Sequence, residues 1–187
     1  MKHIATVALM LNLGVASVYA QQDPVKMHYS GSNVATTINL QDGTVTDEET
    51  LAGNGTLGPF TFRELHADTA SPQPSSTCSG PTHLFFQTVA GGGVFRFQDG
   101  SLLTVKVTQG AICIDLSARM AHLTVTYQIT GGTGRFKGAS GTLTLTATLT
   151  PVLFNGPTSA VLLTSTGEFE GTVSGVARGE DGQDEQQ

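Results

Sequence analysis

Apolar and polar residues alternate along most of the chain from residue 25 onward, which is the pattern of β-strands with one face in a core. The pattern predicts strands over residues 34–40, 60–66, 83–89, 94–97, 102–108, 111–116, 123–129, 141–149 and 160–176. No segment carries a sustained helical stripe. Roughly eight or nine short strands with short connections are typical of a sandwich or a barrel, so the pattern predicts an all-β fold.

Two stretches interrupt this alternation. Residues 41–58 are acidic and rich in glycine, and residues 67–81 have the Ser- and Pro-rich composition of a loop. Residues 179–187 are polar and acidic and are predicted to form a disordered tail, because they have nothing to bury.

The N-terminus has the pattern of a secretory signal peptide. Lys2 precedes an apolar stretch over residues 4–15, and small residues lead up to Ala20. We therefore expect residues 1–20 to be removed and the protein to be secreted, either extracellular or periplasmic. A buried N-terminal helix is the alternative, and the apolar stretch is too short to predict a membrane span.

Residues 21–178 are predicted to form a single β-barrel domain.

Composition narrows the classes of partner. The 187 residues include 9 Lys and Arg against 15 Asp and Glu, for a net charge of −6. Such a surface repels phosphate backbones, so nucleic acid is not an expected partner. Charged residues make up only 13% of the chain, and Gly and Thr are abundant, as in many extracellular β proteins.

The chain has two cysteines, Cys78 and Cys113. Export favours a disulfide between them, which would contribute roughly 3–4 kcal/mol in the chain-entropy model. A reactive free thiol is the alternative, and the spacing fits no zinc pattern. With the disulfide formed, we expect the 67–81 loop to be held across one end of the barrel and to narrow its mouth.

Residues 127–148 contain a glycine-rich run between two predicted strands. The spacing of Gly132, Gly134 and Gly138 does not fit a dinucleotide fingerprint, and a strand follows instead of a helix, so no helix N-terminus is present to bind phosphate. We interpret the run as a tight, bulged corner, in which Phe136 anchors the turn in the core. The glycines of this corner are Gly131, Gly132, Gly134, Gly138 and Gly141.

Residues 127–141 resemble the motif shared by allene oxide cyclases and dirigent proteins. Residues 57–62, 95–100 and 171–177 resemble further strands of the same family in the same order. The resemblance covers most of residues 56–177. It implies an eight-stranded antiparallel, calycin-like barrel with a largely apolar cavity.

The resemblance also implies a kind of function. Allene oxide cyclases close a fatty-acid epoxide into a ring without a cofactor, and dirigent proteins steer the radical coupling of phenols. Both act mainly by shaping a bound substrate, so we expect a small apolar ligand, no cofactor and no metal. The cyclases use a carboxylate early in the barrel, but no glutamate before Thr56 matches that pattern. Dimers and trimers occur among the relatives, and a homo-oligomer of either kind is compatible with this sequence.

The strongest candidates for chemistry lie on one predicted strand. Phe60, Phe62, Glu64 and His66 share one face, so all four point into the lumen if the two phenylalanines do. A carboxylate beside an imidazole in an apolar lumen can act as acid and base, which makes Glu64 and His66 the candidate catalytic pair. The alternative is that both lie at a solvated rim.

Other lumen positions are predicted from the same alternation. They are Phe95, Phe97, Leu103, Val105, Val107, Leu123, Val125, Tyr127, Ile129, Leu143, Leu145 and Ala147. Of these, we expect Phe95, Phe97 and Tyr127 to contact a ligand together with Phe60 and Phe62, although Tyr127 can also be a core residue with its hydroxyl satisfied. Thr142, Thr144, Thr146 and Thr148 are predicted to form an outer wall or an oligomer surface. His28, His83 and His122 are scattered and show no ligand spacing.

Three functions fit these observations: a secreted barrel that binds a small apolar molecule, a cofactor-free cyclase or isomerase, and a structural or interaction barrel with a packed interior. The volume of the lumen separates the third function from the first two, since eight-stranded barrels are either just filled or hold one small ligand.

Overall fold

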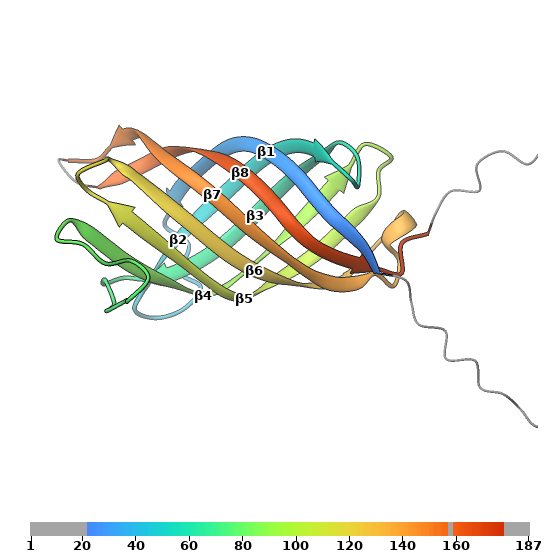
Figure 1. Cartoon of the computed structure of the whole chain (residues 1–187), viewed down its shortest axis with the longest axis horizontal. Helices are drawn as coiled ribbons and strands as arrows, with labels where there is room; N and C mark the ends of the chain where they lie inside the picture. The colour runs from blue at the N-terminus through green and yellow to red at the C-terminus, as the bar shows by residue number, and fades with distance from the viewer. Residues whose placement is uncertain (1–21, 157–158, 178–187) are drawn as a thin grey trace, which may run out of the picture.

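The computed structural model describes residues 22–156 and 159–177, so the predicted signal peptide and acidic tail lie outside the described residues. The strands form a closed antiparallel barrel in which each strand pairs with its neighbours in the chain and β8 pairs with β1 (Figure 1). They are β1 (Gln22–Thr36), β2 (Thr44–Gly55), β3 (Phe60–Thr69), β4 (His83–Phe97), β5 (Leu102–Asp115), β6 (Met120–Gly132), β7 (Ser140–Phe154) and β8 (Ala160–Ser174). The predicted eight-stranded antiparallel barrel is confirmed.

Several predicted strand boundaries are wrong. The acidic 41–58 stretch contains β2, and the first strand is β1, so the strand expected at 34–40 ends at Thr36. β3 continues to Thr69 and includes the first residues of the expected 67–81 loop. β4 and β5 each join two predicted strands, because irregularities in the pairing beside Ala67 and Val107 shift the register and break the alternation.

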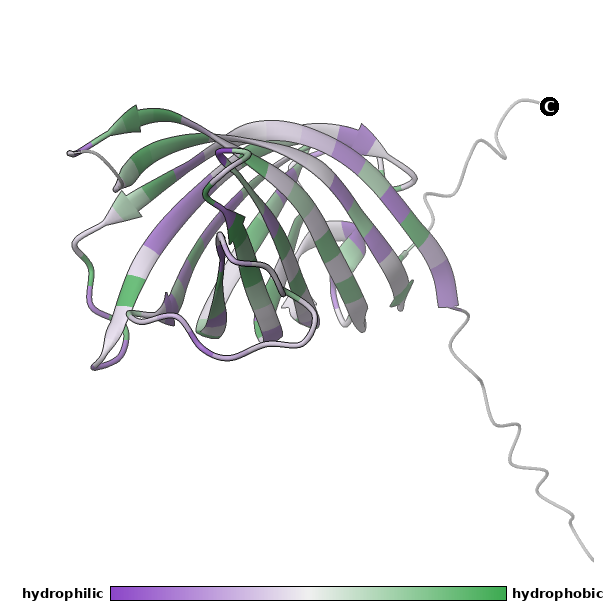
Figure 2. Cartoon of the chain, turned by 60° about the vertical axis from the view of Figure 1, so that its left-hand side comes forward, coloured by the Kyte–Doolittle hydropathy of each residue, from purple (hydrophilic) through white to green (hydrophobic). Residues whose placement is uncertain are grey.

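The barrel interior contains the apolar half of the alternation, and hydrophobic and hydrophilic segments alternate along the strands in Figure 2. The predicted lumen residues are all buried, from Phe60 on β3 to Ala147 on β7. Arg63 and Leu65 lie on the opposite face of β3, and Arg63 is exposed. Among the described residues, no helix is long and apolar enough to cross a membrane.

The two ends of the barrel are built from different connections. One end, here called the aromatic end, has the connections at residues 56–59, 98–101 and 133–139. The other, here called the carboxylate end, has the connections at residues 37–43, 70–82 and 116–119, and β7 ends and β8 begins there. Figure 1 shows the short 3₁₀ turn η1 (Gly134–Phe136) at the aromatic end, opposite the 70–82 connection.

The glycine run forms the corner that closes the aromatic end, as predicted. Gly134 has a φ of 58°, and a Cβ there would lie 2.4 Å from the Ser101 hydroxyl, so glycine fits this position where other residues would be strained. Phe136 is completely buried, and its ring centroid lies 4.7 Å from that of Phe97. The Arg135 guanidinium lies over both of these rings.

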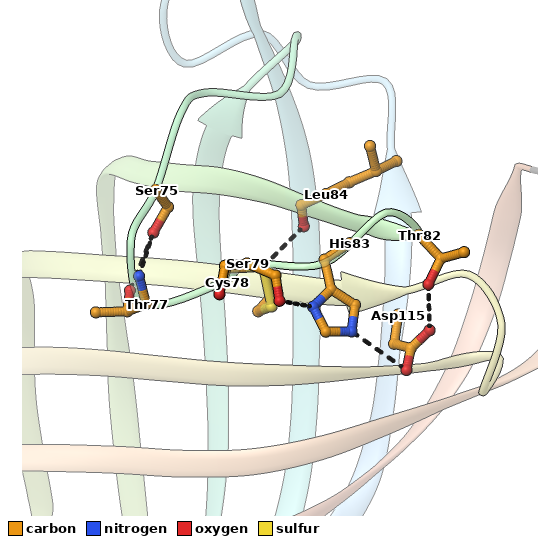
Figure 3. Close-up of a disulfide and its surroundings, with 9 residues drawn as sticks. Ser75, Thr77, Cys78, Ser79, Thr82, His83, Leu84 and Asp115 are labelled. Carbon is orange, nitrogen blue, oxygen red and sulfur yellow. Dashed lines mark hydrogen bonds and ion pairs between the residues drawn. A yellow bond between two sulfur atoms is a disulfide. The ribbon is translucent and has the colours of Figure 1, made fainter.

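The predicted disulfide between Cys78 and Cys113 is present, with a Cα–Cα distance of 5.6 Å. Cys113 lies on the outward side of β5, since its neighbours Ile112 and Ile114 pack against the core. The disulfide therefore fastens the 70–82 connection to the outer wall of the barrel (Figure 3). The expectation that the 67–81 loop narrows the mouth stays a prediction.

Candidate functional site

Four acidic side chains and one histidine come together inside the barrel toward the carboxylate end. β2 and β3 pair so that Glu49 lies opposite Glu64 and Asp47 lies opposite His66. The next inward pair toward the aromatic end is Leu51 and Phe62. The same alternation that buries apolar residues at one end of these strands therefore places acids and an imidazole inside the other end.

Glu64 is held from across the barrel by Tyr127 of β6. The Tyr127 hydroxyl donates a hydrogen bond to Glu64 Oε2 at 2.5 Å, and both side chains are fully buried. Burial raises the pKa of Glu64, while the charge of His66 and the hydrogen bond from Tyr127 act in the opposite direction. The alternative that Glu64 and His66 lie at a solvated rim does not fit their burial, because each is 2% exposed.

The His66 ring lies between two carboxyl groups of its own strand. Its Nδ1 is 3.8 Å from Glu64 Oε1, and its Nε2 is 3.5 Å from Asp68 Oδ2. Burial opposes a charged imidazole, but the carboxyl groups of Asp68, Glu64 and Asp47 outweigh it and raise the pKa of His66 to about 10. Asp47 is half-buried, and burial raises its pKa to about 6.

Glu49 is a buried acid that the sequence did not reveal. It is 0% exposed, it accepts a hydrogen bond from the Ser165 hydroxyl at 3.3 Å, and burial together with the neighbouring Glu64 raises its pKa to about 7. The segment before Thr56 does not align clearly with the cyclase pattern, so the sequence assigned no glutamate of this segment to the carboxylate that the cyclases use. The pairing register with β3 is the signal that identifies Glu49 as inward-facing.

Several buried polar atoms of this cluster lack a hydrogen-bond partner within the described residues. They are Tyr29 Oη, Glu49 Oε2, Glu64 Oε1, His66 Nδ1 and Asp68 Oδ1. Buried polar groups are nearly always paired, and each unpaired one costs about 1–3 kcal/mol. An arrangement that leaves this many unpaired groups in one place is more typical of a functional site than of a structural core.

The cluster has an apolar surrounding. Phe62 and Phe169 border Tyr127 on the side of the aromatic end. Toward the carboxylate end, the inward-facing Ile112 and Ile114 are only partly buried. The polar atoms are therefore surrounded by apolar side chains, and those toward the carboxylate end are more exposed to solvent. Such a site can bind an apolar molecule and fix its orientation through a hydrogen bond to one polar group of that molecule.

The other three histidines in the described part of the chain lie on the outer wall or beside the disulfide. His28 and His122 line a shallow outer groove of about 440 Å³ together with threonines of β6, β7 and β8, and His28 Nδ1 is 3.5 Å from Glu168. His83 Nε2 is 3.3 Å from Asp115, beside Cys78 and Cys113 (Figure 3). Because the two sulfurs form a disulfide, they do not provide thiolate ligands there.

The chain was compared with protein families, curated proteins and solved structures. No protein-family model matches the chain, and no curated protein does. The structure of the pterocarpan synthase dirigent protein GePTS1 is similar, with 14% sequence identity and a TM-score of 0.40, over 87% of this chain and 90% of that one.

Proposed function

We propose that this chain is a secreted barrel that holds a small, mostly apolar molecule at its carboxylate end and acts on it as a cyclase or isomerase. The observation that carries the proposal is the set of buried, unpaired polar atoms around Glu64 and Tyr127 inside an apolar wall. Unpaired donors and acceptors of this kind gain the most from a ligand that pairs with them.

The proposed chemistry uses Glu64 and Tyr127 as a proton acceptor and donor. Glu64 takes a proton from one atom of the bound molecule, and a proton returns to another atom from the Tyr127–Glu64 pair. The substrate is rearranged with no net gain or loss of protons or electrons, so this step needs no oxidant or reductant. His66 positions the carboxyl group through the contact of its Nδ1 with Glu64 Oε1.

Secretion is supported by two independent features. The sequence of residues 1–20 has the pattern of a signal peptide, and Cys78 and Cys113 form a disulfide of the kind that persists in oxidising compartments. Assembly into a homodimer or homotrimer stays a prediction.

A second function, a structural barrel with a packed interior, is favoured by one observation. Aromatic rings contact one another through much of the lumen: Phe60, Phe62, Phe95, Phe97, Tyr127, Phe136 and Phe169. A lumen filled by side chains needs no ligand.

Native mass spectrometry of the exported protein, followed by organic extraction, separates these two functions. A ligand-binding barrel is expected to carry one equivalent of a lipid, terpenoid or phenolic. A protein that emerges empty, and that binds no member of a panel of these classes, would support the packed barrel.

Substitution of Glu64 then tests the catalytic part. Glu64→Gln is expected to keep the ligand and to lose turnover of it, by roughly 100-fold or more for loss of a general acid–base group. The matched control is Glu168→Gln on the outer wall. Equal turnover by the Glu64→Gln protein and the wild type would contradict the catalytic assignment and leave a binding protein.

A further inference from the structure

Asp47, His66 and Asp68 form a second arrangement within the carboxylate end. One potential ligand atom from each residue, either imidazole nitrogen or carboxylate oxygen, lies within 4.8 Å of the other two. The three side chains come from adjacent strands, with Asp47 directly opposite His66 and Asp68 two residues further along β3. We propose that these three residues bind a divalent transition-metal ion, although the sequence predicted no metal.

The distance between His66 and Asp68 suits two ligands of one ion, and a carboxylate oxygen of Asp47 lies within 4.8 Å of a ligand atom of each. His66 Nε2 and Asp68 Oδ2 are 3.5 Å apart, which is long for an N–H···O bond. Two ligands that are each about 2.1 Å from a tetrahedral ion lie about 3.4 Å from each other. The two atoms are therefore already separated by the distance that an ion between them requires.

Burial and unpaired atoms give independent support. His66 is 2% exposed and Asp68 is 4% exposed, and His66 Nδ1 and Asp68 Oδ1 lack hydrogen-bond partners. A metal-binding histidine usually directs its second ring nitrogen toward a carboxylate. Glu64 Oε1 lies 3.8 Å from His66 Nδ1, on the side where such a carboxylate is found.

The charge of the cluster also favours a cation. Asp47, Glu49, Glu64 and Asp68 bring four carboxyl groups together with one imidazole. Within the described residues, the ion pairs of Arg63 and Lys26 are made on the outer wall, with Glu48 and with Glu168 and Glu170. A divalent ion would add positive charge among these carboxyl groups.

The ligand set indicates the kind of ion. One imidazole and two carboxylates suit zinc, manganese or iron better than calcium or magnesium, which prefer oxygen ligands alone. Three protein ligands leave a coordination position open, as in catalytic metal sites. Asp47 is only half-buried, so solvent reaches this member of the cluster.

The test uses the exported, tag-free full chain, treated with a chelator and then titrated with Zn²⁺ by calorimetry and with Co²⁺ by absorption spectroscopy. We expect one equivalent of each ion and the visible bands of Co²⁺ in a low-coordinate site. Asp68→Asn is expected to weaken Zn²⁺ binding by at least about 100-fold, because it removes a ligand. Glu64→Gln is expected to weaken it by about 10–100-fold, because Glu64 lies beside the ring nitrogen of His66 that does not bind the ion. The matched controls are Glu168→Gln and His28→Gln, which remove an exposed acid and an exposed imidazole and should leave binding unchanged.

Two results would overturn the metal site. A wild-type protein that binds neither ion excludes it directly, whether or not the variants fold. Binding that survives in Asp68→Asn but is lost in His28→Gln would place the ion on the outer groove instead. Neither readout needs the small molecule of the proposed function, so failure of the metal site and failure of that function are separate outcomes.

Discussion

The two ends of this barrel are built on the same alternation but contain opposite chemistry. At the aromatic end, Phe97 and Phe136 are in contact, and Arg135 covers both rings while pairing with Asp99. At the carboxylate end, the inward positions of β2 and β3 hold Glu49 and Glu64 with unpaired oxygens. The difference teaches that alternation determines which side chains are inside, whereas the residue type determines whether that interior stabilises the fold or serves a function.

The energetic consequence differs between the two ends. Burial of an aromatic ring contributes several kcal/mol, and ring contacts add about 0.5–1.5 kcal/mol. Burial of a carboxyl group without full pairing is unfavourable. Stability should therefore come mainly from the aromatic end and from the disulfide, while the carboxylate end is kept at some cost in stability.

The largest effect is expected at the aromatic end. Phe136→Ala removes a fully buried ring and should lower the free energy of unfolding by about 3–5 kcal/mol, measured by urea denaturation. The control is Phe154→Ala at the carboxylate end, where the ring is 42% exposed and the loss should be below about 1 kcal/mol. Similar losses at the two sites would remove the contrast between the ends.

The disulfide is expected to be the main support of the carboxylate end. Replacing Cys78 and Cys113 together by alanine should cost roughly 3–4 kcal/mol, since the crosslink closes a 35-residue separation. Hydrogen exchange should become faster in the 70–82 connection and stay unchanged in the 133–139 corner. Uniform acceleration through the barrel would show that the crosslink is not a local support of this end.

The smallest effect is expected from Asp115, which accepts hydrogen bonds from the Ser117 hydroxyl and from the amides of Ser117 and Ala118. These bonds hold the pKa of Asp115 below its usual value of 3.8. A depressed folded-state pKa contributes stability above the unfolded-state value and loses it as the pH falls below that value. Asp115→Asn should therefore reduce the difference in unfolding free energy between pH 5 and pH 3, measured by urea denaturation at both pH values. An unchanged pH dependence would contradict this role.

Much of the aromatic end could be predicted from the sequence, because the residues that determine its structure are close together in the chain. The inward face of 60–66 follows from apolar alternation, and the glycine run marks the corner that holds Phe136. Most of the carboxylate end could not be predicted. β2 places Asp47 and Glu49 inward. From the sequence alone, a strand with buried acidic residues cannot be distinguished from an acidic, solvent-exposed loop.

The remaining relations depend on the closed barrel. Tyr127 reaches Glu64 across the lumen over a separation of 63 residues, and Glu49 is identified by its register opposite Glu64. Alternation predicted that Glu64 and Tyr127 face inward, but it contains no information about which inward residues meet. The joining of 102–108 and 111–116 into one strand was missed for a related reason, since the irregularity near Val107 shifts the register.

The central claim is that the carboxylate end is retained for function and not for stability. The most direct test is the free energy of unfolding of Glu49→Gln, measured in urea at pH 7 beside the wild type. A neutral side chain of the same shape removes the buried charge and keeps an oxygen for Ser165, so we expect equal stability or a gain of about 1–2 kcal/mol. A loss of more than about 2 kcal/mol would contradict the claim, because it would mean that the buried carboxyl group stabilises the barrel as the aromatic rings do.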